Sequence, residues 1–300
     1  MNFPFTKYST IYYIISGLLI VASIVALLVF GLKFGIEFTG GSTLEMQFAN
    51  ERPTNEAILE KLSTLNLGEV IVQPTGEKGV VLRLKGIDET IHQQVVEKVN
   101  ELSPAQEENF QFIGPSVGQE LKNKTLIAIV LALGAITLYI AFAFRKVSRP
   151  VSSWVYGITS LIALFHDILI PVGVFAVLGK FYQAEITIPI VAALLTILGF
   201  SVHDTIVIFD RIRENILKKG NKSFEETIDW SLTQTAGRSV STVFTVLLVM
   251  AFVFFMGGQT LKYFSLALMI GVAAGAYSSI FIAGPLLVTW HQRSERKRIK

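Results

Sequence analysis

Six stretches of this sequence are almost free of charged residues, and each is long enough to cross about 30 Å of hydrocarbon as a helix. The composition agrees, because 51% of the residues are hydrophobic and only 16% are charged, whereas about 25% are charged in an ordinary soluble domain. We therefore predict an α-helical polytopic membrane protein whose six transmembrane helices cover residues 11–32, 125–144, 151–178, 186–209, 239–257 and 263–290.

The first apolar stretch could be confused with a secretory signal peptide. Its apolar core is longer than the roughly 7–15 residues of a signal sequence, and no Ala-x-Ala cleavage site follows it. We therefore expect residues 1–32 to remain as a short N-terminus and a membrane anchor.

The residue types exclude several kinds of chemistry. The chain has no cysteine, which excludes disulfides and thiolate sites, and its four histidines show no metal-ligand spacing. The net charge of +3 comes from basic residues at the ends of apolar runs rather than on a folded face. We therefore expect no enzyme activity, no metal, no cofactor and no nucleic-acid partner.

Lysine and arginine are distributed unevenly between the two sides of the predicted membrane. Fifteen lie in the termini and short connections of one side, and two, Lys180 and Lys262, lie in the short connections of the other. Cytoplasmic loops carry an excess of basic residues. We therefore predict that both termini are cytoplasmic, including the basic tail 291–300, and that residues 33–124 are outside.

The outer segment 33–124 alternates strand and helix periodicities and predicts a small folded domain. We expect strands at 44–48, 70–73, 80–85 and 109–113, helices at 53–65 and 88–102, and a turn at Pro74-Thr-Gly76. Asp88 is the expected cap of the second helix. The order β-α-β-β-α-β predicts a ferredoxin-like α+β fold. Its many charges indicate a solvated face, with partner binding as the alternative.

Two glycine-rich motifs flank this domain, and we expect them to act as hinges, since glycine permits positive φ and close backbone approach. Neither has the frame of a phosphate-binding loop. The first motif includes Gly35, Glu37, Gly40 and Gly41, and the second includes Gly114, Pro115 and Gly118.

Two ionisable pairs lie at membrane depth, His203-Asp204 in the fourth stretch and His166-Asp167 in the third. A charge near the middle of a spanning helix costs roughly 2.5–3.5 kcal/mol on insertion scales, so such residues usually serve an ion or substrate pathway. The alternative is that each carboxyl is a protonated, hydrogen-bonded core group.

The last stretch repeats small residues every four positions. Such a stripe lets another helix approach closely and predicts helix packing rather than chemistry. Its members are Gly271, Gly275, Ser279 and Ala283.

These motifs together resemble the SecD/SecF family of protein-export membrane proteins. The similarity covers nearly all of residues 34–287. It rests on Phe34-Gly-Ile-Glu-Phe-Thr-Gly-Gly41, Thr235-Ala-Gly-Arg-Ser-Val-Ser-Thr242, Tyr277-Ser-Ser-Ile-Phe-Ile-Ala283 and, most specifically, Gly199-Phe-Ser-Val-His-Asp-Thr-Ile-Val-Ile-Phe-Asp-Arg-Ile-Arg-Glu-Asn215.

The resemblance implies a six-span half of an RND-type transporter in the bacterial cytoplasmic membrane. Such a chain would act with a SecD-like subunit beside the SecYEG translocon, with YajC or YidC as further candidate partners. It would use the proton-motive force in late steps of preprotein translocation and release. A subunit of a proton-driven small-molecule exporter is the alternative function, although RND exporters usually have much larger outer domains.

Carried onto this chain, the resemblance makes Asp204 the proton-accepting carboxylate and Arg238 its candidate partner, with His203 and Asp167 as further members of the proton pathway. The chain departs from the family at two positions. Glu37 replaces a more frequent Asp, and His203 replaces a more frequent Asn. His203 can titrate near neutral pH and tune the pathway, or act as a neutral hydrogen-bond donor. For Arg238, an interfacial anchor is the alternative role.

Overall fold

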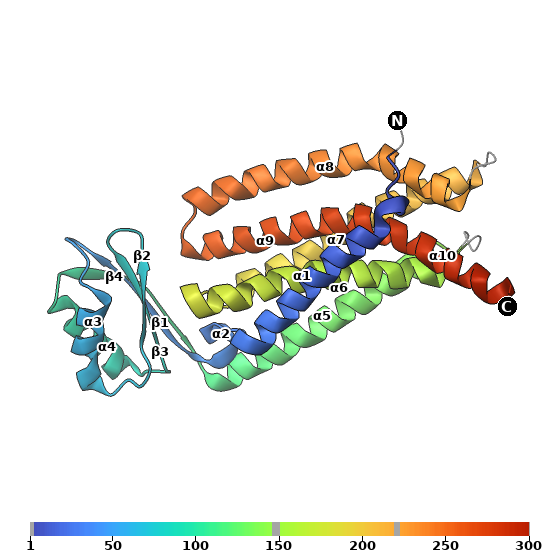
Figure 1. Cartoon of the computed structure of the whole chain (residues 1–300). Helices are drawn as coiled ribbons and strands as arrows, with labels where there is room; N and C mark the ends of the chain where they lie inside the picture. Colours follow the sequence, from blue (N-terminus) through green and yellow to red (C-terminus); the bar gives the residue numbers. More distant parts are fainter. Residues whose placement is uncertain (1–2, 146–150, 219–222, 300) are drawn as a thin grey trace. The chain divides into compact units, whose positions relative to one another are not determined.

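A computed structural model describes residues 3–145, 151–218 and 223–299. Figure 1 shows the order of the elements along the chain. The chain divides into two compact units. The membrane unit comprises Met1–Lys33, Ala128–Ala184 and Pro189–Lys300, and the outer unit comprises Phe34–Ile127 and Glu185–Ile188. Among the basic residues used for the topology prediction, Lys146, Arg149, Lys219, Lys222 and Lys300 lie outside the described residues.

Six helical segments of the described chain are long and apolar enough to cross a membrane, which confirms the predicted number. The first five are α1, α5, α6, α7 and α8. The sixth combines α9, a π-helical turn labelled η3, and α10. Their bounds are Ser9–Phe30, Pro115–Ala143, Ser153–Tyr182, Ile188–Leu217, Phe224–Met256, Gln259–Ser278, Ser279–Ala283 and Gly284–Ile299.

Two helices extend well beyond the apolar stretches that predicted them. α7 continues past residue 209 to Leu217, and α8 begins at Phe224 rather than at 239. A capping box starts α8, since Ser223 and Glu226 each accept a backbone hydrogen bond from the other residue. Hydropathy detects only the part of a helix that lies in hydrocarbon, so polar extensions of this kind escape it.

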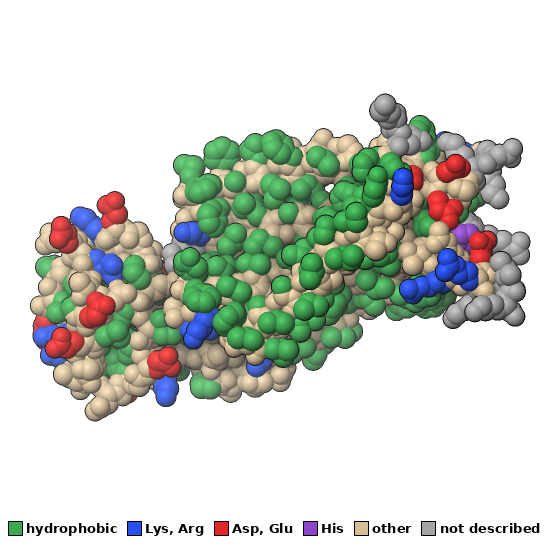
Figure 2. Space-filling view, in the orientation of Figure 1, with side chains coloured by type: hydrophobic (Ala, Val, Ile, Leu, Met, Phe, Trp, Pro, Cys, Tyr) green, Lys and Arg blue, Asp and Glu red, His purple; other side chains and the backbone are tan. Residues whose placement is uncertain are grey.

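The core of the membrane unit is an aromatic and aliphatic cluster. The rings of Phe144 and Tyr156 stack at 5.3 Å, and Phe209 of α7 packs edge-on against Tyr156 at 5.1 Å. By contrast, the apolar side chains of α1, α5 and α8 are largely exposed, as Figure 2 shows for the visible face. Exposed apolar surface over whole helices is the pattern expected of contact with lipid.

The outer unit contains a four-stranded antiparallel sheet with two helices, and this confirms the predicted ferredoxin-like fold. The strands follow the order β2-β3-β1-β4. In sequence, the elements are β1 (Gly41–Phe48), α3 (Asn55–Leu62), β2 (Ile71–Thr75), β3 (Gly79–Leu84), α4 (Glu89–Asn100) and β4 (Ala105–Ile113).

One side of this sheet and the two helices enclose the core of the outer unit. Leu44, Leu82, Ile58 and Val95 are completely buried in it. The side chain of Asp88 accepts a hydrogen bond from the Ile91 backbone N–H at 2.9 Å and caps α4 as expected.

Two local predictions in the outer unit are corrected by the structure. Pro74 and Thr75 belong to β2 rather than to a turn, and the chain reverses at Gly76, whose φ is +60°. Proline is tolerated there because β2 is an edge strand. In addition, β4 begins at Ala105 instead of 109, since an exposed edge strand needs no continuous apolar pattern.

Candidate functional site

The carboxyl group of Asp204 lies between α7, α8 and the last span. Ser239 Oγ donates a hydrogen bond of 2.5 Å to Asp204 Oδ1, and the Ser279 hydroxyl lies near enough to act on this carboxyl. Asp204 Oδ2 is buried and has no hydrogen-bond partner among the described residues. A proton can therefore be added at Oδ2 without breaking an existing hydrogen bond.

The other two residues predicted beside Asp204 are exposed at the surface of this chain. Both His203 and Arg238 lie near enough to act electrostatically on Asp204. No ion pair joins Arg238 to a carboxylate in the part of the chain that the structure describes. The direct α8 contact of Asp204 is instead Ser239, the residue after Arg238.

Asp167 occupies a closed polar cluster in the middle of the membrane unit. Its side chain is completely buried and accepts hydrogen bonds from Ser201 Oγ at 2.5 Å and Ser278 Oγ at 2.8 Å. His166 Nδ1 lies 2.9 Å from the other carboxyl oxygen, while His166 Nε2 is buried without a partner among the described residues. The ring of Tyr277 stacks on His166 at 6.0 Å.

The last span brings the two carboxyl sites together. Ser278 contacts Asp167, and the next residue, Ser279, lies 2.9 Å from Thr205 Oγ1 and also contacts Asp204. Both serines are completely buried. Ser279 opens the π-helical turn η3, and such turns inside α-helices frequently occur at functional sites.

The small residues of the last span pack against α7. A Cβ on Gly271 would lie 2.2 Å from Ile197 Cδ1, and one on Gly275 would lie 3.1 Å from Ser201 Cβ. Ser279 and Ala283 are buried in the π-helical turn that follows. Glycine at 271 thus permits the close approach that places Ser201 and Ser278 around Asp167.

The two glycine-rich motifs of the outer unit pack against each other. Gly40 has a φ of +74°, and a Cβ there would lie 2.7 Å from the backbone of Pro115. A Cβ on Gly118 would lie 2.9 Å from the Gly40 nitrogen, and Gly41 approaches the Leu84 carbonyl equally closely. By contrast, nothing surrounds the Cβ position of Gly114.

An ion pair that the sequence did not reveal lies beside the first motif. Arg83 of β3 pairs with Glu185 of the short segment between α6 and α7, and the two side chains are 19% and 9% exposed. Glu37 lies next to them. Burial raises the pKa of the Glu37 carboxyl, and the nearby Glu185 acts in the same direction while Arg83 opposes it.

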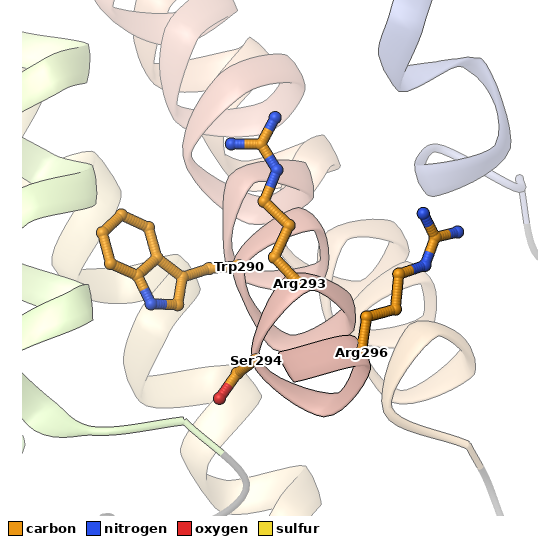
Figure 3. Close-up of a pocket in the computed structure, with 4 residues that line it drawn as sticks. All are labelled: Trp290, Arg293, Ser294 and Arg296. Carbon is orange, nitrogen blue, oxygen red and sulfur yellow. The ribbon is translucent and has the colours of Figure 1, made fainter. Parts of the chain in front are cut away.

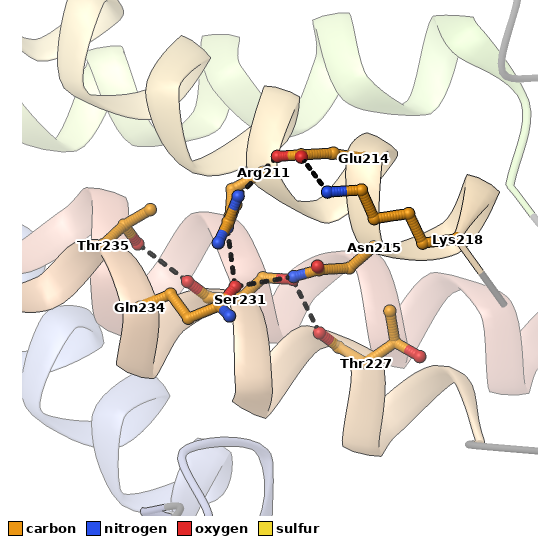
Figure 4. A network of polar contacts seen from close by, with 8 residues as sticks. All are labelled: Arg211, Glu214, Asn215, Lys218, Thr227, Ser231, Gln234 and Thr235. Atoms are coloured by element: carbon orange, nitrogen blue, oxygen red, sulfur yellow. Dashed lines mark hydrogen bonds and ion pairs between the residues drawn. The ribbon is translucent and has the colours of Figure 1, made fainter. Parts of the chain in front are cut away.

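A second polar network joins the C-terminal end of α7 to the N-terminal part of α8 (Figure 4). Arg211 Nε donates to Gln234 Oε1 at 2.6 Å, and Asn215 Nδ2 donates to Ser231 Oγ at 2.8 Å and to Gln234. Glu214 bridges Arg211 and Lys218. These contacts fix α8, which supplies Ser239, against α7, which carries Asp204.

The described part of the basic tail forms one side of an open pocket on α10. Trp290, Arg293, Ser294 and Arg296 line it, as Figure 3 shows. The described lining combines an indole ring, a hydroxyl group and two guanidinium groups. In the described residues, no cluster of three or more His, Cys, Asp or Glu could hold a metal ion.

Sequence reasoning missed the hydroxyl groups that hold both carboxyls. Ser201, Ser239 and Ser278 each lie in a helical stretch where small and hydroxyl-bearing residues are common. A serine in such a stretch is a weak signal, because it can also bond to the carbonyl of its own helix. Glu185 offered a better signal, as the only acidic residue between the third and fourth predicted spans.

These observations define a class: a six-span membrane protein with a ferredoxin-like domain after its first span and two carboxyl groups inside the membrane unit. Residues 92–293 match the family described as protein export membrane protein SecD/SecF, C-terminal, and residues 25–51 match the SecD/SecF GG motif. The chain belongs to the SecD/SecF family of protein-export membrane proteins.

Within that family, the chain is similar to proteins named protein translocase subunit SecF. The identity is 44% with the one from Thermobaculum terrenum, over 94% of this chain and 92% of the relative. It is 36% with the one from Rhodothermus marinus, over 99% and 96% of the two chains. The family match thus groups the chain with protein-export proteins rather than small-molecule exporters, and with multi-pass proteins of the bacterial inner membrane.

The fold is similar to the crystal structure of SecDF, a translocon-associated membrane protein from Thermus thermophilus. The TM-score is 0.86 at 28% identity, over 97% of this chain. A SecDF structure in a super-membrane-facing form gives a TM-score of 0.71 at 29% identity. The chain spans about two fifths of the length of these SecDF chains, 39% and 40% respectively.

Proposed function

We propose that this chain is a SecF-like accessory subunit of the Sec protein translocase. It acts with a SecD-like subunit and uses the proton-motive force in late preprotein translocation and release. The observation that carries the proposal is the carboxyl group of Asp204, inside a fold that matches SecDF. It is held by Ser239, and its second oxygen is buried without a hydrogen-bond partner among the described residues.

Asp204 is the proton-binding group of the proposed pathway. Moving one elementary charge across the membrane potential corresponds to about 2.3 kcal/mol per 100 mV, enough to shift helix arrangements that differ by a few kcal/mol. Arg238 stabilises the ionised form of Asp204, and His203 and Asp167 tune or extend the pathway.

The surface around Arg238 supports a SecD-like partner. His203 and Arg238 are exposed on α7 and α8, although an ionised side chain facing lipid is costly. The chain also spans only 39% of a SecDF chain that contains the same fold. A second set of spans that covers this face would remove both polar groups from lipid. SecYEG, YajC or YidC, and the preprotein are further proposed partners.

The outer unit transmits the membrane event to the emerging preprotein. Its first glycine motif follows α1 directly, and its second opens α5. A change in the packing of these two spans therefore acts on both ends of the ferredoxin-like domain. We place this domain outside the membrane and both termini in the cytoplasm, on the basis of the basic residues in the short connections.

Preprotein export into inverted vesicles tests this function. The chain is reconstituted with its SecD-like partner and the translocon, and export is measured with and without a proton gradient. Asp204→Asn keeps the shape of the side chain but cannot cycle between charged and neutral forms, so the gradient-dependent component of export is expected to fall to background.

The matched control is Asp210→Asn, about 1.7 turns further along the same helix. Asp210 is exposed and pairs with Arg213 at 3.4 Å. This variant is expected to keep the gradient response. A parental response from Asp204→Asn would overturn the proton-pathway assignment and favour a purely structural carboxyl.

A further inference from the structure

The two intramembrane carboxyl groups are connected by consecutive residues of one helix. Ser278 Oγ lies 2.8 Å from Asp167 Oδ2, and Ser279 Oγ lies 2.9 Å from Thr205 Oγ1 and also contacts Asp204. Asp167 belongs to α6, whereas Asp204 belongs to α7. The helix that carries Ser278 and Ser279 is therefore the physical bridge between two carboxyl groups on different spans.

Each of these hydroxyl groups has one proton and two polar neighbours. Ser278 Oγ reaches Asp167 Oδ2 at 2.8 Å and the Gly275 carbonyl oxygen at 3.1 Å. Ser279 Oγ shares its contacts between Asp204 and Thr205. When the carboxyl group is ionised, the serine hydroxyl donates its hydrogen bond to it. When the carboxyl group is protonated, the hydroxyl can donate to its second neighbour instead, or accept a hydrogen bond from the carboxyl.

The backbone around Ser278 and Ser279 favours a joint movement of their two hydroxyl groups. Ser279 opens a π-helical turn, and such a turn interrupts the regular i to i−4 hydrogen bonds of a helix and supplies a local place for rearrangement. The two serines are completely buried, so water does not substitute for a lost hydroxyl contact. A shift of this turn moves both hydroxyl groups together because they are neighbours in the chain.

We propose that Ser278 and Ser279 are positioning residues that couple the protonation of Asp167 to that of Asp204. The coupling rests on the proposed proton-pathway function and assigns a regulatory second site to it. Other titratable groups face the pair. They are His166 of α6 and Tyr277 of the last span near Asp167, Tyr12 of α1 beside Tyr277, and His203 and Arg238 near Asp204.

The test measures the protonation of Asp204 directly in the reconstituted complex with the SecD-like subunit. Infrared difference spectroscopy follows the carboxylic C=O band that Asp204→Asn removes, as a function of pH. Asp167→Asn is expected to shift the midpoint of that band downward by about one pH unit, a tenfold change in proton affinity, because Ser278 no longer has to donate to a carboxyl at 167 and the turn can shift so that Ser279 donates fully to the ionised form of Asp204.

The same shift is then measured in a Ser279→Ala and in a Ser278→Ala background. Coupling through the hydroxyl groups predicts that the shift falls to less than half in either background. Ser279→Thr, which retains a hydroxyl, is expected to restore it. The matched control is Ser265→Ala in the same span, since Ser265 is equally buried but bonds to the Lys262 carbonyl of its own helix.

Three outcomes would overturn the proposal. The first is a midpoint of the Asp204 band that does not change in Asp167→Asn. The second is a midpoint shift that is unchanged in both alanine backgrounds and therefore reflects electrostatics through space. The third is the lack of any Asp204 band that titrates. The first two can occur while the gradient response of the parent complex remains intact. Failure of the coupling is thereby distinguished from failure of the proposed function, which the export assay of Asp204→Asn reports.

Discussion

The guanidinium group of Arg83 on β3 pairs with the carboxylate of Glu185, a residue 102 positions later in the chain. The pair joins the segment between α6 and α7 to the sheet of the outer unit, and both side chains are largely shielded from water. Glu185–Ile188 is part of the outer unit, and the backbone N–H of Gly35 also donates to the Ile186 carbonyl at 2.9 Å.

Glu185→Gln is expected to destabilise the outer unit by roughly 1–3 kcal/mol, because it leaves a buried guanidinium without its charge partner. Thermal unfolding of the purified chain measures the effect. The control is Glu101→Gln, which removes an exposed partner of Lys61 and should change stability by about 0.5 kcal/mol or less. Equal effects of the two variants would contradict a structural role for the Arg83–Glu185 pair.

The Glu37 carboxyl is expected to make the stability of the outer unit depend on pH. Burial raises the pKa of its carboxyl above the ordinary value of 4.5, so folding favours the protonated form. The stability that Glu37 contributes is therefore complete below 4.5 and is lost as the pH rises through the raised pKa. Glu37→Gln is expected to flatten this slope in thermal unfolding measured across that pH range. An unchanged slope would contradict the prediction.

Arg238 should depend on its charge more than on its shape. Arg238→Lys is expected to keep part of the gradient-stimulated export, since a positive charge remains, whereas Arg238→Ala should resemble Asp204→Asn. Export into inverted vesicles separates the two variants. If Arg238→Ala retains the parental gradient response, Arg238 is an interfacial anchor and not a partner of Asp204.

The membrane topology can be tested with reporter fusions. Reporters at Ser148, Asn221 and Lys300, which lie outside the described residues, are expected to read cytoplasmic, and one at Thr75 external. The reason is the count of 15 basic residues against 2 in the termini and short connections. An external signal at Asn221 would contradict the predicted orientation.

The ferredoxin-like domain should fold by itself as residues 37–119, because its core lies within that range. Ile58→Ala is expected to destabilise it by about 2–5 kcal/mol, since Ile58 is completely buried. The neighbouring Leu59 is 40% exposed, and Leu59→Ala should have a much smaller effect. Thermal unfolding followed by circular dichroism measures both. A fragment with no cooperative transition would count against an independent domain.

The sequence by itself determined the number of spans and the topology class of the outer domain. Each span can be recognised in the sequence because a helix in hydrocarbon must be apolar over about twenty residues. In the domain, the local periodicity of apolar residues distinguishes helices from strands. The capping of α4 by Asp88 was equally predictable, since a cap and its N–H partner are three residues apart. The family resemblance carried by the Phe34–Gly41 and Gly199–Asn215 motifs was confirmed as well.

Only the tertiary structure decided which groups surround the carboxyls. Asp167 accepts a hydrogen bond from Ser278, which is 111 positions later in the chain. Asp204 accepts one from Ser239 and not from Arg238, the residue before Ser239. Which of two adjacent residues faces a partner depends on the rotation of a whole helix about its axis. That rotation is set by contacts between distant segments, and the sequence does not show which residues of two segments meet. The stripe of small residues predicts close packing at Gly271 and Gly275, for example, but not that the partners are Ile197 and Ser201.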